Sequence, residues 1–295
     1  MLRHEYTEIN GLTFHCVVAG QGTAMIFLHG FPEFWYEWRH LLPEFAADHH
    51  VIAPDMRGYN LTEKPPAVED YAVRVLVADI KAMFDHYSPG KKGILVAHDW
   101  GGAAAWSFAI AFPAYLEKLV IINAPHPGVF ARELAANPAQ QRASAYMLTF
   151  RSPEAEALLS ANNYAALSKA VFEGSTKPEV FSREDREEYL TAWSQPGALT
   201  GGLNYYRAAR LGPSVGDDGE KPTPFVRDAA SLEVKVPTLV IWGENDRALL
   251  MGNLDGLDEY VPDLRIRRIP GASHWVIHEE PELVSRYIRE FLVQG

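Results

Sequence analysis

Residues 94–112 read ILVAHDWGGAAAWSFAIAF, and this stretch decides the fold class. Its first part, 94–97, is a continuous apolar run, as in a strand that is buried on both faces. His98-Asp99-Trp100-Gly101-Gly102 follows, and 103–112 has the composition of a helix. Strand, tight turn and helix in this order predict a nucleophile elbow with Asp99 at the exposed position. The alternative is that Asp99 only caps the following helix.

Outward from this stretch, strand and helix patterns alternate on both sides. Apolar runs predict further strands at 12–19, 24–28, 51–53, 119–122, 238–242 and 264–269. Helical spacing predicts helices over 71–87 and from Pro281 onward, and in the middle of the chain over 154–172, 183–193 and 203–211. No strand run appears between Pro127 and Lys221. The expected architecture is an α/β domain (1–126 and 222–295) with a helical cap inserted at 127–221.

The composition excludes several classes of protein. The 295 residues include 27 Lys plus Arg and 38 Asp plus Glu, a net charge of -11, which argues against nucleic-acid and anionic-membrane partners. Cys16 is the sole cysteine, so an intrachain disulfide and a cysteine metal cluster are both excluded. The most apolar stretch, 103–112, is too short to span a bilayer, and 1–10 has no apolar signal core. We expect a cytoplasmic location.

Two further strand ends carry residues that complete a catalytic set. Asp246 follows the strand at 238–242, and His274 lies in a small-residue loop after the strand at 264–269. Nucleophile, acid and base in this chain order are expected when an elbow carries the nucleophile. Glu244 is the rival acid and His278 the rival base, although His278 lies where a helix should begin.

A second stretch matches the serine-hydrolase motif G-x-S-x-G literally. Gly212-Pro213-Ser214-Val215-Gly216 precedes Asp246 and His274, so even the chain order fits. A helix is expected before Ser214 and an Asp-Gly turn after it, which leaves no strand–turn–helix context. We therefore interpret this match as coincidental.

The chain resembles the epoxide hydrolase group of α/β-hydrolases over nearly its full length. The resemblance rests on His29-Gly30-Phe31-Pro32, the elbow at 98–102, Leu203-Asn204-Tyr205-Tyr206-Arg207, Asp246 and His274. It implies a mostly parallel eight-stranded sheet flanked by helices, with the cap after the sixth strand. Ala97 is a small departure, because many relatives carry glycine there.

The resemblance also implies roles for individual residues. Two cap tyrosines would grip the epoxide oxygen, and the backbone N–H groups of Phe31 and Trp100 would form the oxyanion hole; Pro32 would be cis. The tyrosines are Tyr146 and Tyr206, for which the alternative is a packing role in the helices. Aromatic residues expected to line an apolar substrate pocket are Trp35, Phe150, Trp193 and Trp275.

These residue types suit the hydrolysis of an epoxide. A carboxylate is already a nucleophile at neutral pH, so Asp99 needs no base to attack an sp³ carbon. A phenol can donate to the oxygen as the ring opens. The ester on Asp99 would then be hydrolysed by water that His274 activates and Asp246 orients. The expected partner is a hydrophobic small-molecule epoxide, with no cofactor and no metal; a homodimer stays open.

Other functions share parts of this pattern. A haloalkane dehalogenase would use the same aspartate, but the halide-binding Asn of that family is Phe31 here and its alternative acid position holds Asn123. Haloacetate dehalogenases carry an arginine after the nucleophile, where this chain has Trp100. A non-catalytic receptor on the same fold could have lost Asp99, Asp246 or His274, yet all three are present. The histidines show no metal-ligand spacing.

Overall fold

A computed structural model describes residues 1–213 and 232–293, and within them eight strands form one sheet. Their spatial order is β1-β2-β4-β3-β5-β6-β7-β8. β2 pairs antiparallel with β1 and β4, and every other neighbouring pair is parallel. The strands are β1 Arg3–Ile9, β2 Leu12–Ala19, β3 Thr23–Leu28, β4 His49–Pro54, β5 Gly93–His98, β6 Leu116–Ile122, β7 Thr238–Gly243 and β8 Leu264–Ile269. The predicted mostly parallel eight-stranded sheet is confirmed, and β1 is the strand that the sequence patterns missed.

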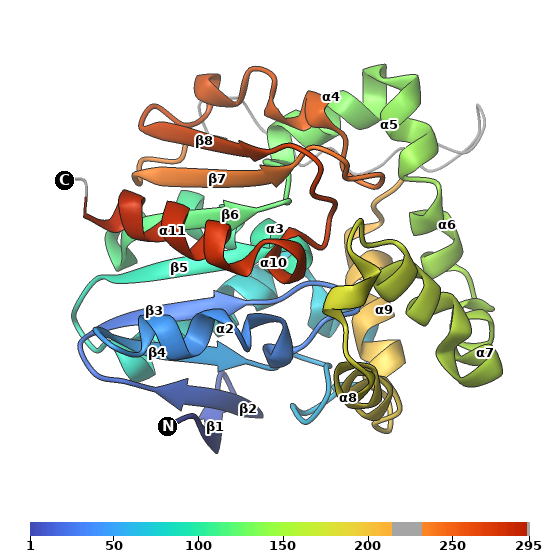
Figure 1. Ribbon diagram of the computed structural model, residues 1–295, viewed down its shortest axis with the longest axis horizontal. Helices are drawn as coiled ribbons and strands as arrows, with labels where there is room; N and C mark the ends of the chain where they lie inside the picture. The colour runs from blue at the N-terminus through green and yellow to red at the C-terminus, as the bar shows by residue number, and fades with distance from the viewer. Residues whose placement is uncertain (214–231, 294–295) are drawn as a thin grey trace.

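Helices pack on both faces of the sheet, and a further set lies between β6 and β7 in the chain. The helices of the sheet body are α1 Leu41–Phe45, α2 Val73–Tyr87, α3 Asp99–Ala111, α10 Val276–Glu279 and α11 Pro281–Leu292. The inserted helices are α4 Pro127–Ala136, α5 Pro138–Ala143, α6 Tyr146–Arg151, α7 Ala155–Ser168, α8 Arg183–Trp193 and α9 Ala198–Ala209. We call α4 to α9 the cap. Figure 1 shows them, green to gold, gathered along one side of the sheet body.

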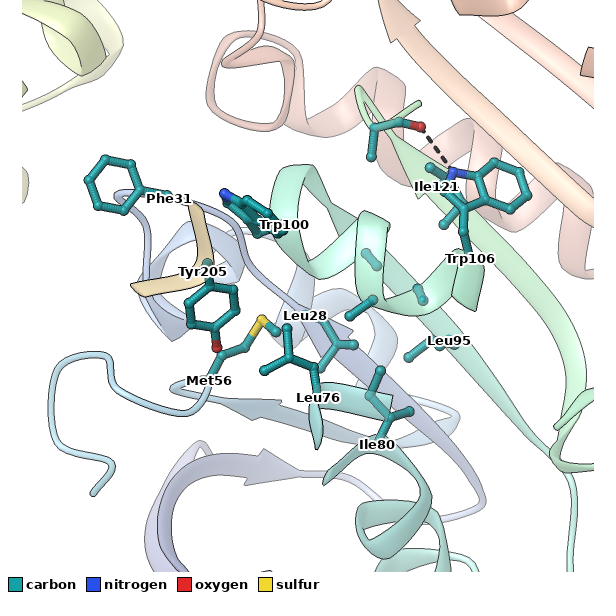
Figure 2. Close-up of a cluster of buried hydrophobic side chains, with 14 of the residues drawn as sticks. Leu28, Phe31, Met56, Leu76, Ile80, Leu95, Trp100, Trp106, Ile121 and Tyr205 are labelled. Atoms are coloured by element: carbon teal, nitrogen blue, oxygen red, sulfur yellow. Dashed lines mark hydrogen bonds between the residues drawn. The ribbon is translucent and has the colours of Figure 1, made fainter. Parts of the chain in front are cut away.

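The period-two geometry of the central strands divides the core into two layers. Along β5, Leu95 packs with the cluster under α2 and α3, whereas Ile94 and Val96 pack with the cluster under α1 and α11. Figure 2 shows the first layer, in which Leu28 and Leu95 of the sheet meet helix side chains. Burying each such leucine stabilises the fold by about 2 kcal/mol. This packing holds the carboxyl ends of β5, β6 and β7 rigidly beside one another.

Polar contacts fasten the cap to the sheet body. The indole N–H of Trp193 donates to the carbonyl oxygen of Pro32 at 2.6 Å, and Arg39 pairs with Asp185 at 2.9 Å. The hydroxyl of Tyr205 donates to the carbonyl oxygen of Arg57 at 2.8 Å. These bonds join α8 and α9 to loops that follow β3 and β4. The predicted boundary at 126/127 coincides with the start of α4, whereas 221/222 lies outside the described residues.

The cap differs in two places from the sequence-based expectation. The helix expected over 154–172 is broken, because the backbone from Ala161 to Tyr164 leaves the helical region and Lys169–Glu173 is a π-helix. The helix predicted over 183–193 is confirmed as α8, and Ser182 with Asp185 forms a capping box at its start. None of the helices in residues 1–213 and 232–293 combines the length and hydropathy needed to span a bilayer.

Candidate active site

Asp99 lies at the turn between β5 and α3, as the elbow pattern predicts. Its φ is +46°, a left-handed conformation that costs roughly 1–2 kcal/mol outside glycine. Two neighbouring glycines make room for this turn. A Cβ on Gly30 would lie 2.3 Å from Cβ of Asp99, and one on Gly101 would lie 2.3 Å from the carbonyl oxygen of Leu28. The small residues around Asp99 are therefore a steric requirement of the turn.

The two carboxylate oxygens of Asp99 have different surroundings. Oδ1 accepts a hydrogen bond from the backbone N–H of Phe31 at 2.9 Å. Trp100 follows in the first turn of α3, where backbone N–H groups have no acceptor inside the helix. Oδ2 lies 3.7 Å from Nε2 of His274. One oxygen thus rests against the predicted oxyanion-hole donor, while the other faces the imidazole.

His274 is oriented by a buried carboxylate. Its Nδ1 lies 2.7 Å from Oδ2 of Asp246, which is 4% exposed. Oδ1 of Asp246 accepts the backbone N–H groups of Ala248 at 2.8 Å and Leu249 at 2.9 Å. This network turns Nε2 toward Asp99. The predicted Asp99, Asp246 and His274 are therefore brought together from the ends of three different strands.

The charges around His274 set its protonation. Burial by itself would lower the pKa of His274, but the charge and hydrogen bond of Asp246, together with the charge of Asp99, raise it to about 9. Burial likewise would raise the pKa of Asp246, and the contact with His274 holds it below its usual range. The free site at neutral pH therefore contains an imidazolium between two carboxylates.

The rival residues lie in other contacts. Glu244 pairs with Arg268 at 2.7 Å. Nε2 of His278 lies 3.1 Å from Oε1 of Glu33. Arg39 donates to Nδ1 of His278 at 3.0 Å. Neither rival reaches Asp99 through these contacts. Ser214, from the literal G-x-S-x-G match, lies outside the described residues.

The two predicted tyrosines come together above the elbow. Tyr146 begins α6 and Tyr206 lies in α9, and their ring centroids are 6.2 Å apart. The Tyr206 ring contacts the Trp100 ring at 5.0 Å and is 2% exposed. Burial raises the pKa of both phenols well above their usual range, and the charge of Asp99 acts in the same direction. Both hydroxyls thus stay protonated and able to donate.

Aromatic rings surround this group. Phe31 contacts Phe150 at 5.2 Å between ring centroids, and Phe150 contacts Tyr206 at 5.1 Å. Figure 2 shows Trp100 at the start of α3, and Phe31 belongs to the loop that follows β3. The Trp275 ring lies 5.0 Å from that of His274, and its indole N–H donates to the carbonyl oxygen of Ala170 at 3.0 Å. These rings form an apolar wall beside the carboxylate.

Two of the predicted pocket residues occupy more distant positions. Trp193 is in α8, and its indole N–H donates to the carbonyl oxygen of Pro32 in the His-Gly-Phe-Pro loop. The Phe31–Pro32 peptide bond in this loop is cis, as expected. Trp35 lies away from the group, because its ring meets His4 of β1 edge-on at 5.2 Å and its backbone N–H donates to Oδ1 of Asp55. Its aromatic character is used in packing against the sheet edge, so the structure does not support Trp35 as a pocket residue.

Comparison with known proteins agrees with the fold and the motifs. Residues 23–281 match the alpha/beta hydrolase fold family. The AB hydrolase superfamily protein YfhM of Bacillus subtilis is 40% identical, over 98% of this chain and 97% of its own. Epoxide hydrolase 4 of Mus musculus is 36% identical, over 98% of this chain and 79% of its own. The chain belongs to the epoxide hydrolase family of α/β-hydrolases.

Solved structures of the epoxide hydrolase family superpose closely. The epoxide hydrolase of Bacillus megaterium in complex with an inhibitor is 37% identical, with a TM-score of 0.89 over 98% of this chain and 99% of the other. The epoxide hydrolase of Vigna radiata is 30% identical, with a TM-score of 0.83 over 100% and 98%. This member of the family is accordingly a hydrolase with the α/β-hydrolase fold.

Sequence reasoning missed an orienting residue in this family member. From the sequence, Asn123 was noted only because dehalogenases can carry an acid at this position. In the structure, its side-chain N–H donates to Oδ2 of Asp246 at 2.7 Å, and its side-chain carbonyl oxygen accepts the backbone N–H of Gly243 at 2.9 Å. Its φ of +37° is a conformation that Asn tolerates better than most residues. A polar residue directly after the buried run of β6 was the available signal.

Proposed function

We propose that the chain hydrolyses an epoxide to a vicinal diol through a covalent ester on Asp99. The observation that carries the proposal is the asymmetric placement of the Asp99 carboxylate, with Oδ1 on the N–H of Phe31 and Oδ2 facing His274. The similarity to named epoxide hydrolases supports the same reaction. The substrate class that suits the aromatic wall is a hydrophobic epoxide.

In the first step, Oδ2 of Asp99 attacks an epoxide carbon and the carbon–oxygen bond of the ring breaks. The epoxide oxygen takes a proton from Tyr146 or Tyr206, whose phenols lie beside the elbow. General-acid assistance of this kind contributes about 10²–10⁴-fold to a rate. The products of the step are an uncharged ester and a tyrosinate.

Ester formation changes the charge at the site. The ester no longer contributes the negative charge that helps to raise the pKa of His274 in the free protein. The pKa of His274 therefore falls, and the imidazolium gives up its proton, which returns the tyrosinate to the neutral phenol and leaves His274 as a base. The site thus acquires its base only after the nucleophile has reacted.

In the second step, His274 removes a proton from water, which attacks the ester carbonyl. The distance of 3.7 Å between Nε2 of His274 and Oδ2 of Asp99 places the imidazole close to the acyl carbon of the ester. The oxyanion develops on Oδ1, against the N–H groups of Phe31 and Trp100. Each such donor is worth about 3 kcal/mol of barrier. Collapse of the tetrahedral intermediate breaks the bond between the acyl carbon and Oδ2, which leaves with the diol and takes the proton that His274 removed from water. The new Asp99 carboxyl group then gives its proton to His274, which restores the free site.

Halide release is the second candidate reaction, because the same aspartate can displace halide. The indole of Trp100 would be the halide-binding donor, but its ring lies edge-on against the Tyr206 ring, with 5.0 Å between the centroids. The two tyrosines suit the opening of an epoxide, because the ring oxygen needs a proton, which a leaving halide does not. The arrangement therefore favours the epoxide.

A side-by-side turnover screen tests the proposal. Wild-type protein is incubated with a styrene-oxide-like epoxide, a haloalkane and fluoroacetate, and diol and halide are both quantified. We expect diol from the epoxide and little halide from the other two substrates. Halide release without diol formation would replace the proposal with a dehalogenase.

Replacing Tyr206 by phenylalanine is expected to slow diol formation by about 10²-fold, because the proton donor to the epoxide oxygen is lost. The measurement is single-turnover epoxide consumption. Tyr205→Phe is the matched control, because the Tyr205 hydroxyl binds the carbonyl of Arg57 instead of the site. Equal losses in the two variants would assign Tyr206 a packing role.

A further inference from the structure

One buried acid lies beside the active site and has no part in the mechanism above. Glu37 belongs to the 3-10 helix Trp35–Trp38, and its side chain is fully buried. Its Oε1 lies 2.5 Å from Nδ1 of His98, the residue before Asp99. Close as they are, these two atoms do not have hydrogen-bond geometry: both carboxyl oxygens of Glu37 and Nδ1 of His98 are buried without a hydrogen-bond partner among the described residues. A buried, otherwise unpartnered carboxyl group needs a physical reason to persist.

The other side of His98 fixes where its proton lies. Nε2 of His98 is 3.1 Å from the backbone carbonyl oxygen of His274. A carbonyl only accepts, so Nε2 carries the hydrogen. In a neutral imidazole Nδ1 is then an acceptor, and the Glu37 oxygen beside it must bring the proton. Glu37, His98 and the main chain of His274 thus lie in one row, in which the printed hydrogen bond runs from Nε2 of His98 to the His274 carbonyl and the short Glu37–His98 contact needs a proton between its two atoms.

The surroundings of Glu37 favour its protonated form. Ionisable groups from several elements face Glu37. They are Glu33 on the loop that follows β3, His278 on α10, His98 and Asp99 at the turn between β5 and α3, and His274. Burial raises the pKa of Glu37 well above its usual range, and the charges of Glu33 and Asp99 act in the same direction. Burial together with the neighbouring His274 lowers the pKa of His98 to about 4. An ion pair between Glu37 and His98 would be desolvated on both sides.

We propose that Glu37 is a positioning residue: it holds His98 as the Nε2–H tautomer, and His98 in turn holds the main chain of His274 at the distance from Asp99 that ester hydrolysis requires. The tautomer is a property of the folded protein, whereas the effect on ester hydrolysis rests on the proposed function. Loss of the Glu37 proton at alkaline pH removes the donor to His98, so ester hydrolysis should then fall.

Two variants distinguish the loss of the proton donor at Glu37 from a change in the packing of its side chain. Glu37→Gln keeps the shape and a permanent N–H donor, and Glu37→Ala removes the donor. Glu133→Gln is the control, since Glu133 is a buried acid of α4 that binds Asn137 and Arg132 away from the site. Ester hydrolysis is measured across pH in single turnovers, and the nitrogens of His98 are observed by ¹⁵N NMR. Thermal unfolding verifies that each variant is folded.

We expect Glu37→Ala to slow ester hydrolysis about 10–100-fold, the usual effect of losing an orienting partner. Glu37→Gln should stay close to wild type at neutral pH and lose the alkaline fall. In wild-type protein, His98 should show an unprotonated Nδ1. Protonation of both His98 nitrogens at neutral pH, or an alkaline fall unchanged in Glu37→Gln, would overturn the proposal. The NMR result needs no turnover, so it stands even if the protein hydrolyses no epoxide.

Discussion

Asp99→Ala should abolish diol formation, with a loss on the order of 10⁶-fold, as when a covalent nucleophile is removed from a catalytic triad. The physical reason is that the Asp99 carboxylate has one oxygen on the N–H of Phe31 and the other facing His274 at 3.7 Å. The measurement is diol production from a styrene-oxide-like epoxide under conditions of substrate excess. Binding of the epoxide should persist, because the aromatic wall is intact.

The control for this variant is Glu244→Gln. Glu244 follows β7 near Asp246 but pairs with Arg268, so its replacement should leave turnover unchanged. Thermal unfolding of Asp99→Ala verifies the fold, since alanine at a φ of +46° retains the strain of the turn. Undiminished turnover in a folded Asp99→Ala protein would remove Asp99 from the mechanism.

His274→Ala should separate the two halves of the reaction. Attack by Asp99 needs no base, so the variant should still consume about one equivalent of epoxide per site. Ester hydrolysis needs the imidazole, so steady-state diol formation should fall on the order of 10⁵-fold or more. Epoxide and diol are quantified separately by chromatography. Consumption without diol release is the expected signature.

The exposed His86, whose ring lies against Tyr87, provides the control for His274→Ala. His86→Ala should convert epoxide to diol at the wild-type rate. If His274→Ala released diol at an undiminished rate, another group would have to be the base. If it consumed no epoxide while still binding it, the two-step scheme would be wrong at its first step.

The sequence patterns were sufficient for β2 to β8 and for the order of the three central residues. Residues 94–102 encode the elbow locally, because a buried apolar run, a turn of small residues and a helix each have their own pattern. The strands after it obey the same rule, so Asp246 and His274 follow the ends of β7 and β8. Parallel strands bring such ends to one edge, which is why chain order predicted proximity.

Elsewhere, tertiary contacts determine the structure, and the local sequence patterns do not predict it. Trp35 has the aromatic character of a pocket residue, but its direction depends on the 3-10 turn after Pro32, which carries it toward β1. The break at Ala161 to Tyr164 in α7 contains no proline, so no helix-breaking residue predicts it. Asn123 and Glu37 matter only through partners far away in the chain. A glutamate inside the aromatic run Phe34–Trp38 was nevertheless a signal, because buried acids require partners.

Intact and peptide-level mass spectrometry of His274→Ala after incubation with an epoxide tests the central claim most directly. The account predicts a mass gain equal to one substrate molecule, located on the peptide that contains Asp99 and removed by alkaline hydrolysis of the ester. An adduct on a different residue, or steady diol formation by the variant with no adduct at any time, would contradict it.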